Sequence, residues 1–176
     1  MIIRLENPLT ENYKKVKEYI LGDKFSWYWV GVSTPNININ GYCNYGFFSH
    51  ALLKRPGEEG IFYSNPTSKY VNDIQAVFME IANVHNINFQ VIHRMNVNCM
   101  IPSSNRKYGN PHLDHHFPHK NCLIYLTNSG GNVRVFGDNE VVDYSPEEDD
   151  IILFEGKHCP QPPKEDRRVC IVVTYS

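Results

Sequence analysis

A stretch rich in histidine, GNPHLDHHFPHK at residues 109–120, contains side chains that bind divalent metals. If the H-x-D tripeptide of His112 and Asp114 lies on a strand, both side chains point to one face, because residues two apart share a face. His115 would then point away, and Pro118 indicates that the strand ends nearby. We therefore expect His112 and Asp114 to be metal ligands. The histidines expected to lie in solvent instead are His115, His116 and His119.

A third ligand must come from elsewhere in the chain, and the candidate is His158 in LFEGKHCPQPP, which follows a strongly apolar stretch. Two histidines and one carboxylate on one face of an octahedron leave three positions open, as in non-haem Fe(II) oxygenases. Zinc more often takes a closed cage of four ligands, or three ligands and one water. We interpret Cys159 as a structural thiol, because adjacent strand residues point to opposite faces. His112, Asp114 and His158 are thus the candidate catalytic metal ligands.

The composition argues against several classes of protein. A chain of 176 residues has room for a single domain, 1–176, and its net charge of −2, without any run of about five or more Lys or Arg, disfavours nucleic acid as a partner. Its 5 cysteines form no C-x-x-C pair, which argues against disulfides or a zinc ribbon and favours a reducing compartment. No apolar stretch approaches the ~18 residues of a membrane span, so we expect a cytoplasmic protein. The oligomeric state is not indicated.

The hydrophobic pattern predicts two helices followed by short strands. The first helix runs from the capping residue Thr10 to Gly22, and the second begins after Thr67 or Ser68. One strand is expected at 25–33, before a segment rich in Gly, Asn and Pro. The other strands are expected at 88–101, 110–115, 121–127, 132–137, 140–145, 149–156 and 167–176. This order predicts an α+β fold: a helical, loop-rich part, 1–87, and a core, 88–176, forming a double-stranded β-helix (jelly roll) with the N-terminal helices packed on one sheet.

The order HLD, LIYLTNSGGNVRVF, DDIILFEGKH and RRVCIVVTYS resembles the 2-oxoglutarate/Fe(II)-dependent oxygenases, in particular the small phage and marine-microbial members of their prolyl-hydroxylase-like branch. The resemblance covers about residues 90–176, whereas residues 1–88 match nothing. It implies that His112, Asp114 and His158 hold Fe(II). It also implies that 2-oxoglutarate and O2 are cosubstrates and that oxidative decarboxylation yields succinate.

In that family an arginine beyond the second histidine binds the far carboxylate of 2-oxoglutarate. The resemblance favours Arg168, with Arg167 as the alternative, because a slip of one residue reverses the facing of a strand. The resemblance also implies that Tyr125 contacts the far carboxylate of 2-oxoglutarate, although this residue could equally be a core aromatic. Asn98 lies on a polar strand face that is directed either into the pocket or to water. Two departures are Val133, where the family has a hydroxyl, and the absence of a tyrosine near Pro102, which Tyr108 could replace.

These patterns favour a dioxygenase that hydroxylates an unactivated C–H bond of a peptidyl (prolyl-type) substrate, an amino acid or another small molecule. We expect residues 31–66 to cover the pocket and select the substrate. One alternative is a non-catalytic, metal-binding module of the cupin-like jelly-roll type. Another is a histidine-rich zinc module, whose folding would fail in chelator.

Overall fold

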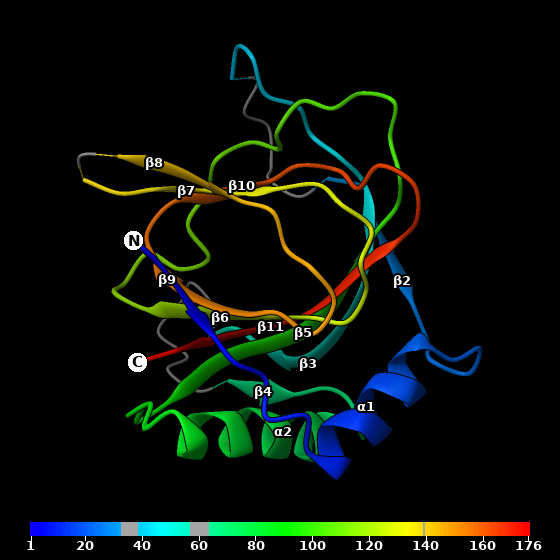
Figure 1. Cartoon of the computed structure of the whole chain (residues 1–176), viewed down its shortest axis with the longest axis vertical. Helices are drawn as coiled ribbons and strands as arrows, with labels where there is room; N and C mark the ends of the chain where they lie inside the picture. Colours follow the sequence, from blue (N-terminus) through cyan, green and yellow to red (C-terminus); the bar gives the residue numbers. More distant parts are fainter. Residues whose placement is uncertain (33–38, 57–63, 139) are drawn as a thin grey trace.

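The computed structural model describes residues 1–32, 39–56, 64–138 and 140–176, which form two antiparallel sheets and two helices (Figure 1). The helices are α1 (Glu11–Leu21) and α2 (Val71–Val84). The strands are β1 (Ile2–Leu5), β2 (Tyr28–Val30), β3 (Phe47–Lys54), β4 (Asn65–Pro66), β5 (Ile92–Met100), β6 (Lys120–Tyr125), β7 (Val133–Phe136), β8 (Val141–Tyr144), β9 (Ile151–Glu155), β10 (His158–Pro160) and β11 (Arg168–Tyr175).

The larger sheet has the strand order β1-β9-β6-β11-β5-β3-β2, with β4 paired to β3, and the smaller sheet has the order β10-β7-β8. Figure 1 shows the smaller sheet on one side of the larger sheet and both helices on its other side. The helices therefore pack on one sheet, as predicted. The sequence pattern did not reveal that β1 and β3, from the N-terminal half of the chain, belong to the larger sheet.

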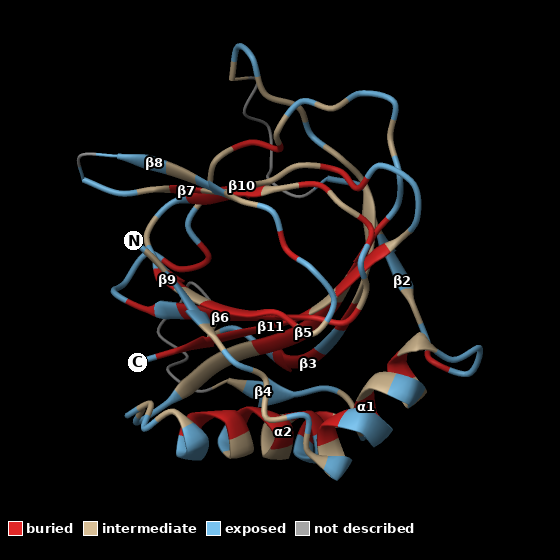
Figure 2. Cartoon of the chain, viewed as in Figure 1, coloured by how far each residue is buried: buried red, intermediate tan, exposed pale blue. Residues whose placement is uncertain are grey.

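The first helix forms as its sequence predicts. The side chain of Thr10 accepts a hydrogen bond from the amide of Tyr13 at 3.1 Å, and Gly22 ends the helix. The second helix begins at Val71, later than expected, because the hydroxyl of Ser68 is engaged in the preceding turn, where it accepts from the amide of Tyr70. Each helix turns its buried face toward the sheet (Figure 2).

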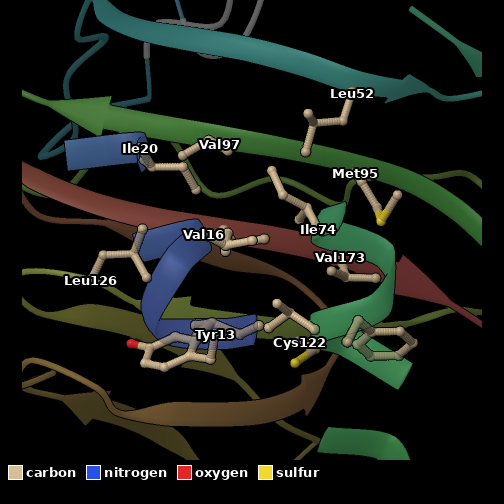
Figure 3. Packing of buried hydrophobic residues seen from close by; sticks show 14 of the residues in the cluster. Tyr13, Val16, Ile20, Leu52, Ile74, Met95, Val97, Cys122, Leu126 and Val173 are labelled. Carbon is tan, nitrogen blue, oxygen red and sulfur yellow. The ribbon is translucent and has the colours of Figure 1, made fainter. Parts of the chain in front are cut away.

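The main hydrophobic core lies between the helices and the larger sheet (Figure 3). On β11, Val169, Ile171 and Val173 belong to this core. The residues that alternate with them therefore face the smaller sheet, because successive side chains point to opposite faces. We call this second side of the larger sheet its inner face. Between this face and the smaller sheet lies a smaller apolar cluster, with Leu123, Tyr125, Ile152, Phe154 and Val172 from the larger sheet and Val133 and Val135 from β7.

The strand expected at 110–115 does not form. His112 makes only an isolated bridge with His158, and the residues around it are irregular. Pro111 and Pro118 lack the amide hydrogens that a strand pairing needs, so neither can donate to a ladder. Residues 110–119 are called the ligand segment below. No helix in the described ranges is long and apolar enough to cross a membrane.

Replacing Phe78 with alanine is expected to lower the free energy of unfolding by about 3–5 kcal/mol, because its ring is fully buried against Phe89 and Tyr175. Its neighbour Met79 is 51% exposed, and Met79→Ala should change stability by no more than about 0.5 kcal/mol. Urea unfolding followed by circular dichroism measures both variants. Equal losses would mean that α2 is not oriented as described.

Candidate metal and cosubstrate site

The ligand segment is joined to β10 by two backbone hydrogen bonds. The amide of His112 donates to the carbonyl of His158 at 2.9 Å, and the amide of His158 donates to the carbonyl of His112 at 3.0 Å. The two imidazole rings consequently lie side by side, with centroids 4.6 Å apart. Two histidines that are distant in the sequence are thus held together by the main chain.

The free nitrogen of His112 is defined by its hydrogen bonding. Its Nδ1 lies 3.0 Å from the carbonyl oxygen of Asn110. A carbonyl can only accept, so Nδ1 carries the proton and Nε2 keeps its lone pair for a metal. Burial lowers the pKa of His158 to about 4, against the opposing charge of Asp114. His158 is therefore neutral at pH 7, which is the state that binds metal.

Asp114 is buried and ionised. Its Oδ2 lies 3.7 Å from Nε2 of His158, while its Oδ1 contacts Nη1 of Arg94 at 2.5 Å. Burial would raise the pKa of Asp114, but the charges of Arg94, both histidines and Arg55 outweigh it and hold the pKa well below its usual range. The carboxylate therefore has a charged partner on one oxygen, and its other oxygen faces His158.

His158 lies beside both His112 and Asp114, but the three side chains are not drawn together around a common point. Nowhere in the described part of the chain are three or more His, Cys, Asp or Glu side chains placed so that they could hold a metal ion as they stand. The donor set nevertheless fits one chemically, since two imidazoles and one carboxylate are available. The buried Nδ1 of His158 also has no hydrogen-bond partner among the described residues.

The remaining histidines of the ligand segment differ from expectation. His115 and His119 are buried, at 5% and 8% exposure, and only His116 is exposed. His115 is near Thr174 of β11, whose hydroxyl lies 2.7 Å from its Nε2, and burial lowers the pKa of His115 to about 3. The prediction that all three lie in solvent is therefore wrong for two of them. A lone polar residue gives no sequence signal that a distant strand will cover it.

The two adjacent arginines point in opposite directions. Arg167 donates to the carbonyl of Leu21 at the end of α1. Arg168 is 5% exposed on the inner face, where it donates to the carbonyl of Gly131 at 2.8 Å and lies 3.4 Å from Sδ of Met100. In the described part of the chain, both hydrogen bonds of its guanidinium thus go to uncharged acceptors. Burying a cation that has only uncharged partners costs free energy of folding unless an anion binds it.

Tyr125 and Asn98 lie on the same inner face. Tyr125 pairs with Cys170 of β11 and is buried, which raises its pKa, while the charge of Arg168 acts in the opposite direction. Asn98 pairs with Cys170 from the other side, and its Oδ1 accepts from Ser49 at 2.9 Å. The polar face of β5 is thus directed between the sheets rather than outward.

Cys159 is completely buried, and burial raises its pKa to about 12, so it is an inert structural thiol. His50 hydrogen-bonds to the carbonyl oxygen of Ser26 and to the hydroxyl of Ser68 on the helix side of the sheet. The groove between α1 and α2, of about 300 Å³, also lies on that side. None of these features belongs to the site.

Sequence reasoning placed Arg94 on a polar strand face but gave it no role, and it missed Arg55; both residues contact Asp114. It also missed Asn121, whose completely buried amide has no hydrogen-bond partner among the described residues. The alternation of polar and apolar residues in IHRMNVNCM places Arg94 on a face with Asn96 and Asn98. That alternation was the one signal that could have identified Arg94.

No protein-family model and no curated protein matches the sequence. Solved structures do match its fold. An oxidoreductase of the 2OG-Fe(II) oxygenase family from Burkholderia pseudomallei aligns with a TM-score of 0.73 and 12% identity, over 99% of this chain and 84% of that one. A prolyl hydroxylase from Trichoplax adhaerens, solved in complex with a peptide of the hypoxia inducible factor oxygen degradation domain, aligns with a TM-score of 0.61 and 17% identity, over 99% and 82%.

A prolyl-4-hydroxylase from Pseudomonas putida aligns with a TM-score of 0.54 and 14% identity, over 99% of this chain and 91% of that one. These alignments span nearly the whole chain, including residues 1–88, for which the sequence alone gave no resemblance. The chain therefore has the fold of the 2-oxoglutarate/Fe(II)-dependent oxygenases, including that of prolyl hydroxylases.

Proposed function

We propose that this protein is an Fe(II)- and 2-oxoglutarate-dependent dioxygenase, built on a double-stranded β-helix, that hydroxylates an unactivated C–H bond. One observation carries the proposal: the buried Arg168 lies on the inner face of the larger sheet with only uncharged hydrogen-bond partners among the described residues, and Arg94 of the same sheet contacts Asp114 of a two-histidine, one-carboxylate set. His158 borders that face, because its ring lies 4.9 Å from that of Phe154. The shared fold supports the same assignment.

The proposed roles follow from the position of each group. His112, Asp114 and His158 hold the iron, which when bound supplies the activation of dioxygen coupled to decarboxylation of 2-oxoglutarate. Arg168 binds the far carboxylate of 2-oxoglutarate, since a guanidinium matches a carboxylate in charge and in geometry. Tyr125 can donate its hydroxyl hydrogen to the same carboxylate.

The apolar cluster beside these polar groups excludes water from their surroundings. Leu123, Ile152 and Val172 are all buried there beside Tyr125. Charge interactions are stronger in such a medium than in water, so one guanidinium can orient a dianion. Asn98 lies at the polar border of the cluster, where it is positioned to contact the cosubstrate or a water beside it.

For the substrate we propose a peptidyl, prolyl-type side chain or an amino acid. One similar fold is that of a prolyl hydroxylase solved with a peptide. Residues 31–66 are proposed to select the substrate, although positions 33–38 and 57–63 lie outside the described residues. Within the described part of this segment, Phe48 of β3 packs on the exposed Trp29 of β2, with ring centroids 5.1 Å apart.

The function is tested by succinate formation from 2-oxoglutarate with Fe(II) and air. We expect the wild-type protein to form succinate slowly without a substrate and faster with an accepted peptide or amino acid, and His112→Ala to form none. Metal binding without succinate would support the non-catalytic, cupin-like alternative. Loss of the folded state in chelator would support a structural zinc module.

A further inference from the structure

Two arginines hold Asp114, one on strand β5 and one directly after strand β3. Nη1 of Arg94 lies 2.5 Å from Oδ1 of the carboxylate. Arg55 donates from Nη1 to the main-chain carbonyl of Asp114 at 2.8 Å, and its Nη2 lies 3.9 Å from Oδ1. Both the side chain and the backbone of this proposed ligand are therefore anchored by guanidinium groups.

These anchors compensate for an irregular backbone. Asp114 lies in the ligand segment, which has no strand pairing beyond the single bridge at His112. Arg94 lies on β5, which is paired with β11 on one side and β3 on the other, and its register partner is Thr174. Arg55 directly follows β3. The sheet thus supplies a rigidity that the segment around Asp114 lacks.

The contacts also distinguish the two oxygens of the carboxylate. Oδ1 is taken by Arg94, whereas Oδ2 is the oxygen nearest to Nε2 of His158, at 3.7 Å. A carboxylate without such a partner can rotate and can bind a metal through one oxygen or both. With Oδ1 held by Arg94, Oδ2 is the oxygen presented on the side of His158.

We propose that Arg94 is a positioning residue of the metal site, which holds Asp114 so that Oδ2 is presented to the ion and Oδ1 is withheld from it. The inference rests on the proposed function, because it takes His112, Asp114 and His158 as the ligands. It adds a residue that does not itself touch the ion. One-oxygen binding by Asp114 keeps three coordination positions open, which 2-oxoglutarate and dioxygen require.

Removing Arg94 has two opposing effects on metal binding. The positive guanidinium repels a cation, so its loss could tighten binding. Its loss also frees a buried carboxylate on an irregular segment, and partners of ligands typically contribute about 10–100-fold to metal affinity. We expect positioning to dominate, because Asp114 has no regular backbone structure to hold it in place.

The test titrates Mn²⁺ alone into the protein and follows the free ion by electron paramagnetic resonance. Arg94→Met removes the hydrogen-bond donors and keeps the length of the side chain, and it should bind Mn²⁺ about 10–100-fold more weakly than wild type. Arg94→Lys retains a charged donor and should stay within about threefold of wild type. If Arg94→Met does not fold, Arg94→Gln replaces it, and weaker binding is again expected.

A matched control is Arg4→Met. Arg4 pairs with Asp150 at 2.7 Å, and Asp150 is as buried as Asp114, at 5% exposure, but neither belongs to the site. This variant should bind Mn²⁺ like wild type. Unchanged affinity in folded Arg94→Met would overturn the inference, and so would tighter binding or a Lys variant as weak as the Met variant. If wild type binds no Mn²⁺, or binds it as well after His112→Ala, the proposed metal site itself fails.

Discussion

Replacing His112, Asp114 or His158 by alanine is expected to abolish metal binding. A lost ligand should cost more than the roughly 10–100-fold that loss of an outer partner costs, because it removes a bond to the ion itself. Anaerobic Fe(II) titration, or Mn²⁺ in its place, measures the affinity of each variant. The expectation for Asp114 also includes some loss of stability, since its removal leaves Arg94 without its carboxylate partner.

The controls are two histidines of the same segment. His116 is exposed, and His116→Ala should keep full metal affinity and stability. His119 is 8% exposed, so His119→Ala is expected to lower stability while it keeps metal affinity. A loss of metal in His119→Ala as large as in His112→Ala would mean that the ligand set has been assigned to the wrong residues.

Arg168→Ala is expected to raise the KM for 2-oxoglutarate by roughly 10–100-fold in the succinate assay. A hydrogen bond to a charged group contributes about 1.5–3 kcal/mol, and each 1.4 kcal/mol corresponds to a factor of ten. The affinity for metal should change little, because Arg168 is not a ligand. Removing the guanidinium should also destabilise the turn at Gly131, whose carbonyl it holds.

Arg167→Ala is the matched control for this prediction. Its guanidinium donates to the carbonyl of Leu21 on the helix side of the sheet, so the variant should lose some stability and keep its KM. A large rise of KM in Arg167→Ala, with none in Arg168→Ala, would contradict the inner-face assignment of β11. Similar rises in both variants would indicate a general loss of structure rather than a lost contact.

The parts of the fold that the sequence could predict are those set by local periodicity. In α1, the capping hydroxyl of Thr10 and the spacing of Tyr13, Val16 and Ile20 determine both the ends and the buried face. The alternation of side chains along β11 likewise places Arg167 and Arg168 on opposite faces. Such signals need no information about distant residues.

The parts that it could not predict depend on contacts between distant segments. His112 and Asp114 were expected on a strand, yet His112 is held by a bridge to His158 and Asp114 by Arg94. The same limit applies to His115, whose burial depends on Thr174 of the last strand. Short polar segments carry no periodicity, and their conformation is decided by the elements that surround them.

The reciprocal bridge between His112 and His158 ties the motions of the two histidines together. Each amide donates to the carbonyl of the other residue, so one local opening breaks both hydrogen bonds. The two amide protons should therefore exchange with solvent at closely matched rates, set by the free energy of that opening. An ion that binds only the closed form would slow both rates by the same factor. Hydrogen exchange at these two backbone positions thus reports occupancy of the site without any need for turnover.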